Sequence, residues 1–317
     1  MTGTASFWDA TGMEQSCDLD LTGTPADVGV SDVYGKTCNA AFDKPDVGDF
    51  FGPVQVMNFV VPAASSQTSI SAEAAYLVFG FGMAGAVAPY TDDNLIFRRN
   101  ETSGTQLMIT TALSQGGQPF PGTKWKGIDA TGSGALLTKV STSAMPEATI
   151  GILASDLADD AVTGGKIKIL QYQHYEQSCG FLPDSSTTSH DKKNVRDGHY
   201  PIWGPLHMFA KIGADKKPTN KAAATLIDAI TGAAEVTGVN MIDVEISAHT
   251  IPGCAMQVGR TAEIGALMSV APAKPCGCYF EAKANGAAPT SCKTCTTDTD
   301  CAGGPATHCR YGYCEAS

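Results

Sequence analysis

The sequence lacks an excess of basic residues. It has 21 lysines and arginines against 32 aspartates and glutamates, which gives a net charge of −11. Proteins that bind nucleic acid usually carry a basic stripe, so this composition argues against nucleic acid as a partner. Any site for an anion must therefore be built locally, from a few hydrogen-bond donors. With 317 residues, the chain is long enough for two medium-sized domains.

Long apolar runs are also missing. No stretch is long and apolar enough to be a transmembrane segment. The first residues, MTGTASFWDATG, lack the basic start and apolar run of a signal peptide. The 11 cysteines nevertheless are typical of an oxidising compartment. We therefore expect a periplasmic or extracellular protein, present here in a mature, trimmed or mis-started form.

Residues 276–317 lack leucine, isoleucine, valine, methionine and tryptophan, but contain seven cysteines. A segment of this composition cannot build an apolar core, so disulfides or a metal must hold it together. Disulfides fit the compartment better, although Cys292-x-x-Cys295 leaves a zinc site as an alternative. Since seven is odd, one of these cysteines is free, pairs with another chain, or reaches the main body. Within the main body, the plausible disulfides are Cys17–Cys38 and Cys179–Cys254.

Strand patterns and helix patterns alternate along the rest of the chain. This alternation predicts an α/β fold with ligand sites at the ends of strands. One helix is predicted to place Ala223, Leu226, Ile227 and Ile230 on a single buried face. The predicted strands cover 27–34, 54–61, 94–97, 149–155, 166–173 and 201–212, and the predicted helices cover 71–79, the residues after 103, and 221–230.

The segment FRRNETSGTQLMITTAL (97–113) predicts a strand, a polar turn and the start of a helix. A helix start exposes unpaired N–H groups and the positive end of the helix dipole, and therefore attracts anions. Ser103 and Thr105 add hydroxyl donors, Gly104 permits close approach to the backbone, and Arg99 offers a planar guanidinium. An ordinary capped helix beside a surface arginine is the alternative interpretation.

The motif resembles that of the phosphate-binding proteins of ABC uptake systems, which have the type 2 periplasmic binding fold. In that family an arginine four positions before Ser-Gly-Thr holds the phosphate, and Arg99, Ser103, Gly104 and Thr105 match this pattern. A Ser-Asp pair after a short strand supplies the carboxylate that accepts the proton of the bound phosphate. Ser31 and Asp32 in DVGVSDVY match that element. The resemblance covers most of residues 20–270 and leaves the Cys-rich tail outside it.

The N-terminal region departs from the family. There, a first strand and a glycine-rich loop supply further phosphate donors well before the Ser-Asp pair. Only 28 residues precede Gly29 here, and none of them is predicted to form that unit, although residues 2–6 could be a remnant of it.

The resemblance implies a two-lobed α/β protein with a ligand cleft between the lobes. Residues 1–90 and 200–275 are predicted to form lobe one, 91–199 an inserted lobe two, and 276–317 a small disulfide-rich module. The implied function is capture of phosphate or a related oxyanion with hinge closure, without cofactor, metal or catalysis. An ABC permease or an envelope component is the implied protein partner.

Two other functions remain open from the sequence. A surface or assembly protein could reuse the binding fold, with the Cys-rich tail as its anchoring or interaction module. A secreted phosphatase-like enzyme would need a nucleophile–base pair or a metal cluster, and the sequence shows neither. Gly132-Ser133-Gly134 lacks the flanking pattern of a nucleophile elbow, so Ser133 is interpreted as a cleft or loop residue.

Other interpretations of the site residues are more ordinary. Asp32 could cap a turn, and Arg99 could pair with Glu101 or Asp92 at the surface. Arg98 alternates in direction with Arg99 along the strand and is expected to face solvent.

Overall fold

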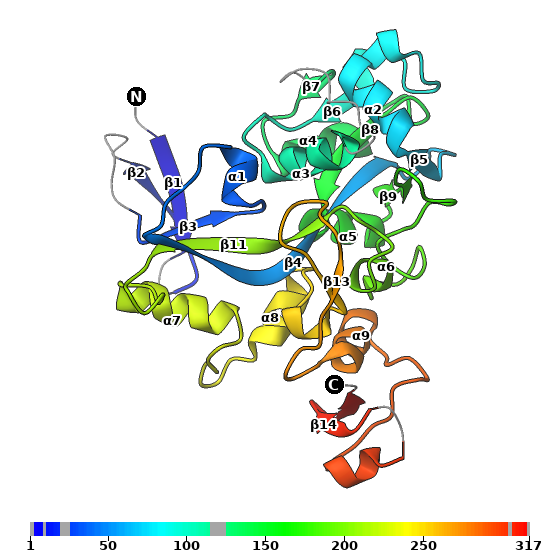
Figure 1. The fold of residues 1–317 in the computed structure, drawn as a ribbon. Coiled ribbons are helices and arrows are strands. Elements are labelled where there is room, and N and C mark those ends of the chain that lie inside the picture. The colour runs from blue at the N-terminus through cyan, green and yellow to red at the C-terminus, as the bar shows by residue number, and fades with distance from the viewer. Residues whose placement is uncertain (1–2, 9–10, 20–25, 115–124, 304–305, 316–317) are drawn as a thin grey trace.

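A computed structural model describes residues 3–8, 11–19, 26–114, 125–303 and 306–315, with side chains described for 11–16 and from 26 onward in these ranges. One long strand, β4 (Val47–Pro62), runs through most of the molecule, and helices lie along its length (Figure 1). The other strands are β1 (Gly3–Trp8), β2 (Glu14–Leu19), β3 (Val28–Ser31), β5 (Ser69–Ser71), β6 (Ile96–Arg98), β7 (Ile128–Asp129), β8 (Ile150–Ala154), β9 (Ile167–Ile169), β10 (Gln171–Gln173), β11 (Trp203–Lys211), β12 (Val258–Gly259), β13 (Met268–Ser269), β14 (His308–Arg310) and β15 (Tyr313–Glu315).

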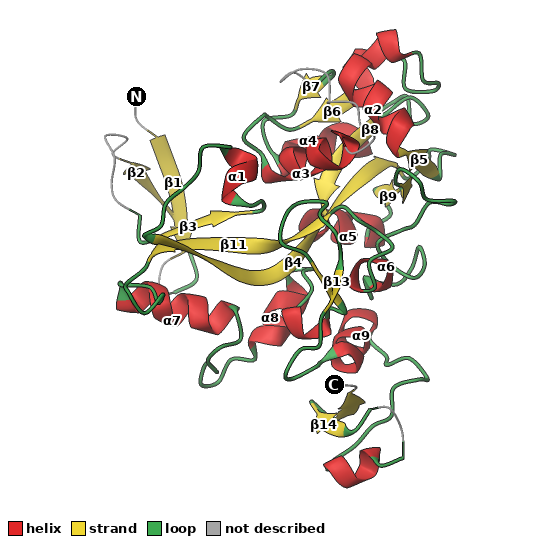
Figure 2. Cartoon of the chain, in the orientation of Figure 1, coloured by secondary structure: helices red, strands yellow, loops and turns green. Residues whose placement is uncertain are grey.

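The helices lie around this sheet (Figure 2). Good N-caps begin two of the predicted ones, because Ser71 accepts from the Ala74 amide and Asn220 accepts from the amides of Ala222 and Ala223. The helices are α1 (Gly35–Cys38), α2 (Ala72–Phe81), α3 (Gly104–Leu113), α4 (Ser133–Ser141), α5 (Ser155–Thr163), α6 (Lys193–Arg196), α7 (Lys221–Ile230), α8 (Met241–Ser247) and α9 (Gly277–Asn285).

The central sheet has seven strands in the order β3-β11-β4-β8-β6-β7, and β9 also pairs with β4. The pairs β3–β11, β11–β4 and β4–β8 are antiparallel, whereas β8–β6 and β6–β7 are parallel. The register of β11 shifts between Pro205 and His207, where proline cannot donate to the ladder. The β1–β2 hairpin forms a separate two-stranded sheet, and β11 occupies the place between β3 and β4.

The main apolar core surrounds the second half of β4. That half is buried from Val56 to Pro62, and Phe59, Val60 and Val61 are fully inaccessible to solvent. A continuous apolar run of this kind is expected where helices cover both faces of a sheet. A second, smaller cluster of Met208, Ala210 and Ile227 joins α7 to the first part of the sheet.

The predicted elements agree with the structure in position, with three corrections. The strand predicted at 54–61 begins earlier, at Val47, because its first half alternates between partly buried and exposed positions and lacks a continuous apolar signal. The strand predicted at 166–173 is divided into β9 and β10. Leu226, expected on the buried face of α7, is 49 % exposed, because that face is centred on Ala223 and Ile227.

Disulfides hold the C-terminal segment, as predicted. Cys254–Cys276 links it to the main body, which accounts for the odd number of cysteines in the tail. The expected Cys179–Cys254 pair is therefore wrong, and Cys179 has a free, exposed thiol. Cys38 is also free, so the expected pair with Cys17 is not formed; the Cys17 side chain lies outside the described residues. The bonds within the tail are Cys278–Cys292, Cys295–Cys309 and Cys301–Cys314.

These bonds also exclude the zinc alternative. The sulfur atoms of Cys295, Cys301 and Cys314 lie within 4.8 Å of one another, but all three are oxidised and cannot act as thiolate ligands. The tail also contributes to the main core, although its composition does not predict this, because α9 packs with Phe280 and Cys276 buried there. Within the described residues, no helix combines the length and the apolar character that crossing a membrane requires.

Candidate functional site

The start of α3 carries several polar groups with no partner. Ser103 is the N-cap residue, yet its hydroxyl caps no backbone amide. Ser103 and Thr105 are 8 % and 4 % exposed, and Gln106 Oε1 is buried without a hydrogen-bond partner among the described residues. Buried polar groups are normally hydrogen-bonded, so the unpaired Gln106 Oε1 beside two hydroxyls makes this helix start a candidate ligand site.

Asp32 lies directly against this helix start. It follows β3, and its carboxylate is in contact distance of the Gly104 backbone; a Cβ atom on Gly104 would lie 2.5 Å from Asp32 Cβ. Glycine is therefore required at position 104, because any side chain would displace the carboxylate. The structure thus brings together two residues that are 72 positions apart in the sequence and that the motifs single out separately.

Arg99 approaches the same region from β6. Its Nη1 donates to the hydroxyl of Ser133, the first residue of α4, and its Nε is buried without a partner among the described residues. The charge of Arg99 also acts on Asp32, where it opposes the rise in pKa that burial causes. The ion pairs with Glu101 or Asp92 that the sequence leaves open are not present between these described side chains. Arg99 therefore contacts the start of α4, keeps an unpaired Nε among the described residues, and acts on Asp32 through its charge.

Two carboxylates compete for this arginine. Burial raises the pKa of Asp32, the nearby Asp156 raises it further, and Arg99 and His207 oppose the change. Burial also raises the pKa of Asp156, which lies in the first turn of α5. Its hydrogen bond from the Leu157 amide and the charge of Arg99 act in the opposite direction. At both carboxyls, the charge of Arg99 thus opposes the rise in pKa that burial causes.

His207 adds a buried polar atom beside Asp32. It lies on β11 opposite Ser31, is fully buried, and donates from Nδ1 to the Asp49 carboxylate at 2.9 Å. Its Nε2 is buried without a partner among the described residues. The sequence places His207 in an apolar strand, and nothing in its spacing distinguishes it from the other histidines.

The remaining predicted residues differ in their placement. Ser31 donates to the Val33 carbonyl at 2.8 Å and accepts from the Val33 amide at 3.1 Å, so its hydroxyl organises the turn that carries Asp32. Arg98, expected to face solvent, is half-buried and pairs with Asp129 at 3.7 Å across β6 and β7.

Sequence reasoning missed Gln106, Asp156 and His207 as members of the site. Gln106 follows the Ser-Gly-Thr motif within the first turn of α3, which is a usable local signal. The other two reach the site only through the fold, from α5 and β11, and carry no such signal. Ser133, interpreted from the sequence as a cleft or loop residue, contacts Arg99.

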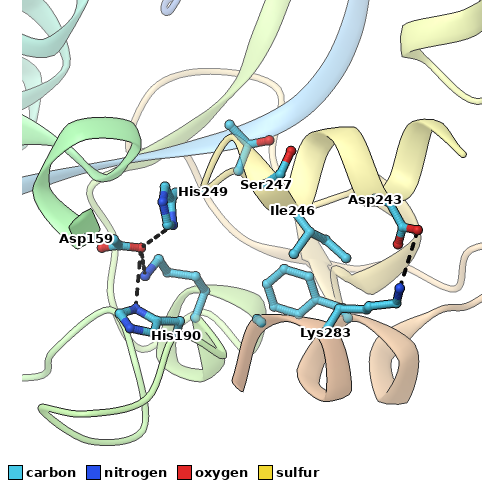
Figure 3. A pocket seen from close by; sticks show the side chains of 11 residues that line it. Asp159, His190, Asp243, Ile246, Ser247, His249 and Lys283 are labelled. Atoms are coloured by element: carbon cyan, nitrogen blue, oxygen red, sulfur yellow. Dashed lines mark hydrogen bonds and ion pairs between the residues drawn. The ribbon is translucent and has the colours of Figure 1, made fainter. Parts of the chain in front are cut away.

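A second cluster of charged groups includes Asp159 of α5 and lies around a cavity of about 400 Å³ (Figure 3). Asp159 lies between His190 and His249, with its Oδ2 3.8 and 3.6 Å from their Nδ1 atoms. The buried ammonium of Lys192 lies 2.6 Å from Asp159 and 2.8 Å from Asp184. Because Lys192 already neutralises this carboxylate, the cluster is not suited to a metal cation.

Comparisons with known proteins bear on the fold. No protein-family model and no curated protein sequence matches the chain. A phosphate-bound structure from Clostridium perfringens, described as a phosphate ABC transporter substrate-binding protein, has a TM-score of 0.50 and 13 % identity, over 72 % of this chain and 79 % of that one. An ABC-type phosphate transport receptor from Vibrio cholerae has a TM-score of 0.46 and 13 % identity, over 71 % of this chain and 80 % of that one.

A phosphate-binding protein from Stenotrophomonas maltophilia has a TM-score of 0.43 and 15 % identity, with 73 % of this chain and 77 % of that chain covered. Sequence identities this low support a similarity of fold and nothing more. Of the three matches described, the first reaches a TM-score of 0.50. The chain therefore has the two-lobed α/β fold of phosphate-binding proteins of ABC uptake systems, with a disulfide-rich module added at its C-terminus.

Proposed function

We propose that the protein is an extracytoplasmic solute-binding protein that captures inorganic phosphate or a related oxyanion between its two lobes. The observation that supports this most is the start of α3, where Ser103, Thr105 and the unpaired Gln106 Oε1 lie at the helix end that Asp32 contacts. The charge of Arg99 acts on the same Asp32. Binding needs no cofactor and no catalytic step, and the lobes would close on the ligand about a hinge.

Each predicted residue has a distinct role in this proposal. The Arg99 guanidinium and the hydroxyls of Ser103 and Thr105 donate to the oxyanion, and the Gly104 amide does so from the backbone. Asp32 accepts the proton of the bound ligand, and Ser31 holds the turn on which Asp32 lies. The Ser133 hydroxyl and the start of α4 supply the donors that the family obtains from its first glycine-rich loop.

The acidic groups determine which oxyanion is accepted. Asp32 contacts the start of α3, and the charge of Arg99 acts on both Asp32 and Asp156 and favours their ionised forms. A ligand that carries a proton, such as hydrogen phosphate, can donate to a carboxylate. A fully ionised sulfate cannot donate and would be repelled, so the site is expected to select phosphate over sulfate.

Calorimetric titration with phosphate and with sulfate tests the site. We expect phosphate to bind and sulfate not to bind. The Arg99→Ala variant should lose about 10- to 100-fold in phosphate affinity, because a charged hydrogen bond is removed. The Arg98→Ala variant is the matched control, since Arg98 pairs with Asp129 and should leave affinity unchanged. Equal heats for the wild type and Arg99→Ala would refute the site.

The proposed protein partner is an ABC permease. The alternative role in assembly drew support from the odd number of cysteines in the tail. That argument is weakened, because Cys276 is bonded to Cys254 within the chain. Non-reducing electrophoresis distinguishes the two: a monomer band fits solute capture, whereas disulfide-linked multimers through Cys38 or Cys179 would favour assembly.

A further inference from the structure

A second, larger groove lies on the opposite side of the sheet from the proposed oxyanion site, where α7 and α8 lie along β4 (Figure 1). It has a volume of about 720 Å³, within the range of small-molecule sites. Its walls are largely apolar and come from distant parts of the chain, including Phe51, Ile230, Val236, Val239, Ile242 and Tyr311.

The rim of this groove exposes apolar side chains. Phe51, Val239 and Tyr311 are 48 %, 46 % and 41 % exposed. Tyr311 comes from the Cys-rich tail, and Cys254, which also lines the groove, is bonded to Cys276 at the beginning of the tail. The disulfide-rich module therefore contributes Tyr311 to the wall of the groove.

One carboxylate in the groove wall has no partner. Glu245 of α8 lines the groove, and no hydrogen bond or ion pair to its carboxylate is present among the described residues. The Thr250 hydroxyl and amide both donate to the Glu245 backbone carbonyl instead. Burial raises the pKa of Glu245 to about 7. Glu245 is partly exposed, so its unpaired carboxylate is accessible from the groove and is a candidate for function.

Neighbouring charges are already paired elsewhere. Asp243, on the same helix, accepts from Tyr279 Oη at 2.6 Å and pairs with Lys283 at 3.4 Å, both from α9. Lys274 and Glu235 pair with each other at 3.9 Å at the groove rim, where both are mostly exposed. Glu245 is thus the charge in the groove wall that lacks a counter-ion.

We propose that this groove binds a small organic cation, with an amine that pairs with Glu245 and an apolar body that fills the space bounded by Ile230, Ile242 and Tyr311. This site is independent of the proposed oxyanion site, because the two have different residues and lie on different helices. The apolar walls provide burial for the body of the ligand, and the carboxylate fixes its orientation.

Calorimetry with two probes of equal shape tests the proposal. The probes are 4-phenylbutylamine and its neutral analogue 4-phenylbutan-1-ol, both titrated into the full chain at about pH 8, where Glu245 is ionised. We expect the amine to bind at least about tenfold more tightly than the alcohol, the ratio expected for one charge-assisted hydrogen bond. Equal affinities for the two probes, or no detectable amine binding at millimolar concentration, would overturn the proposal.

Two variants test whether Glu245 is the carboxylate that pairs with the amine. Glu245→Gln should reduce amine affinity by about tenfold and leave alcohol affinity unchanged. Glu235→Gln is the matched control, because Glu235 is an acidic residue of the same groove that is 97 % exposed at the rim. If Glu235→Gln weakens the amine as much as Glu245→Gln does, the assignment to Glu245 is wrong. Amine affinity of the wild type should also fall between about pH 8 and about pH 6, as Glu245 takes up a proton.

Discussion

The two halves of β4 lie in very different environments, although they belong to one continuous strand. Residues 56–62 are buried without exception, and β8 and β9 pair with this half. Residues 47–52 are partly or largely exposed and pair only with β11. The first half packs on α7 through the small cluster around Met208, whereas the second half is surrounded by the main core.

The candidate oxyanion site lies where these two regions meet. Asp32 comes from the thinly packed region, at the end of β3, whereas Arg99, Ser103 and Asp156 come from the deeply packed one. A site built this way has donors held rigidly on one side and an acidic acceptor on the side with fewer buried contacts. Local opening is easiest where buried apolar contacts are few, so the β3 side is the one expected to move when a ligand enters.

Replacing one phenylalanine in each half tests this difference in packing. Phe59→Ala should lower the free energy of unfolding by about 3–5 kcal/mol, because Phe59 is fully buried against Phe79 and Tyr172. Phe51→Ala should cost about 1 kcal/mol or less, because Phe51 is 48 % exposed. Urea unfolding measures both variants. Similar costs for the two would contradict the contrast between the halves.

The sequence predicted much of the deeply packed region, because its signals are local. Ser71 caps α2 as expected, and the continuous apolar run ending at Pro62 predicted a buried strand. The first part of β4 was not predicted, since its alternation is interrupted by glycines and depends on pairing with β11, which lies about 150 residues away in sequence. Strand pairing over such distances leaves no local pattern.

The same reasoning explains the outcome for the candidate site. Arg99, Ser103, Gly104 and Thr105 lie within seven consecutive residues, so a motif could identify them together. Asp156 could not be identified, because its side chain reaches Arg99 only through the position of α5. The disulfide pairing was equally inaccessible: eleven cysteines allow many pairings, and the choice of Cys276 as partner of Cys254 depends on the docking of α9.

Replacing the buried Lys192 provides a second test of the deeply packed region. Burial alone would lower the pKa of Lys192, but Asp184 and Asp159 outweigh it and hold the pKa above its ordinary value. Lys192→Met should lower the free energy of unfolding by about 3 kcal/mol, because it removes the ammonium that lies between two buried carboxylates. Lys193→Met is the control: its side chain is 58 % exposed and its pair with Asp197 contributes little. A Lys192 variant as stable as the Lys193 variant would show that this cluster is not held by charge.

The smallest expected effect on the free energy of unfolding concerns Asp156, at the candidate oxyanion site, and it depends on pH. Because burial raises the pKa of Asp156, the folded protein binds this proton more tightly than the unfolded chain does. The stability that this proton contributes is present below the ordinary pKa of 3.8 and is lost as the pH rises through the raised value. Asp156→Asn should therefore increase the free energy of unfolding by less than about 1 kcal/mol at neutral pH, because Asp156 is exposed and solvent screens its charge, and should change it little at acid pH.

Urea unfolding at about pH 7 and about pH 3.5 measures this difference, and calorimetry with phosphate provides a second readout. Loss of one negative charge beside Arg99 should increase phosphate affinity several-fold, because less repulsion opposes the anion. Asp160→Asn is the control, since Asp160 lies on the same helix and is 76 % exposed. If Asp156→Asn weakens phosphate binding or destabilises the protein at neutral pH, Asp156 supports the site instead of opposing the anion. In that case the inference that the Asp156 charge opposes phosphate binding beside Arg99 is wrong.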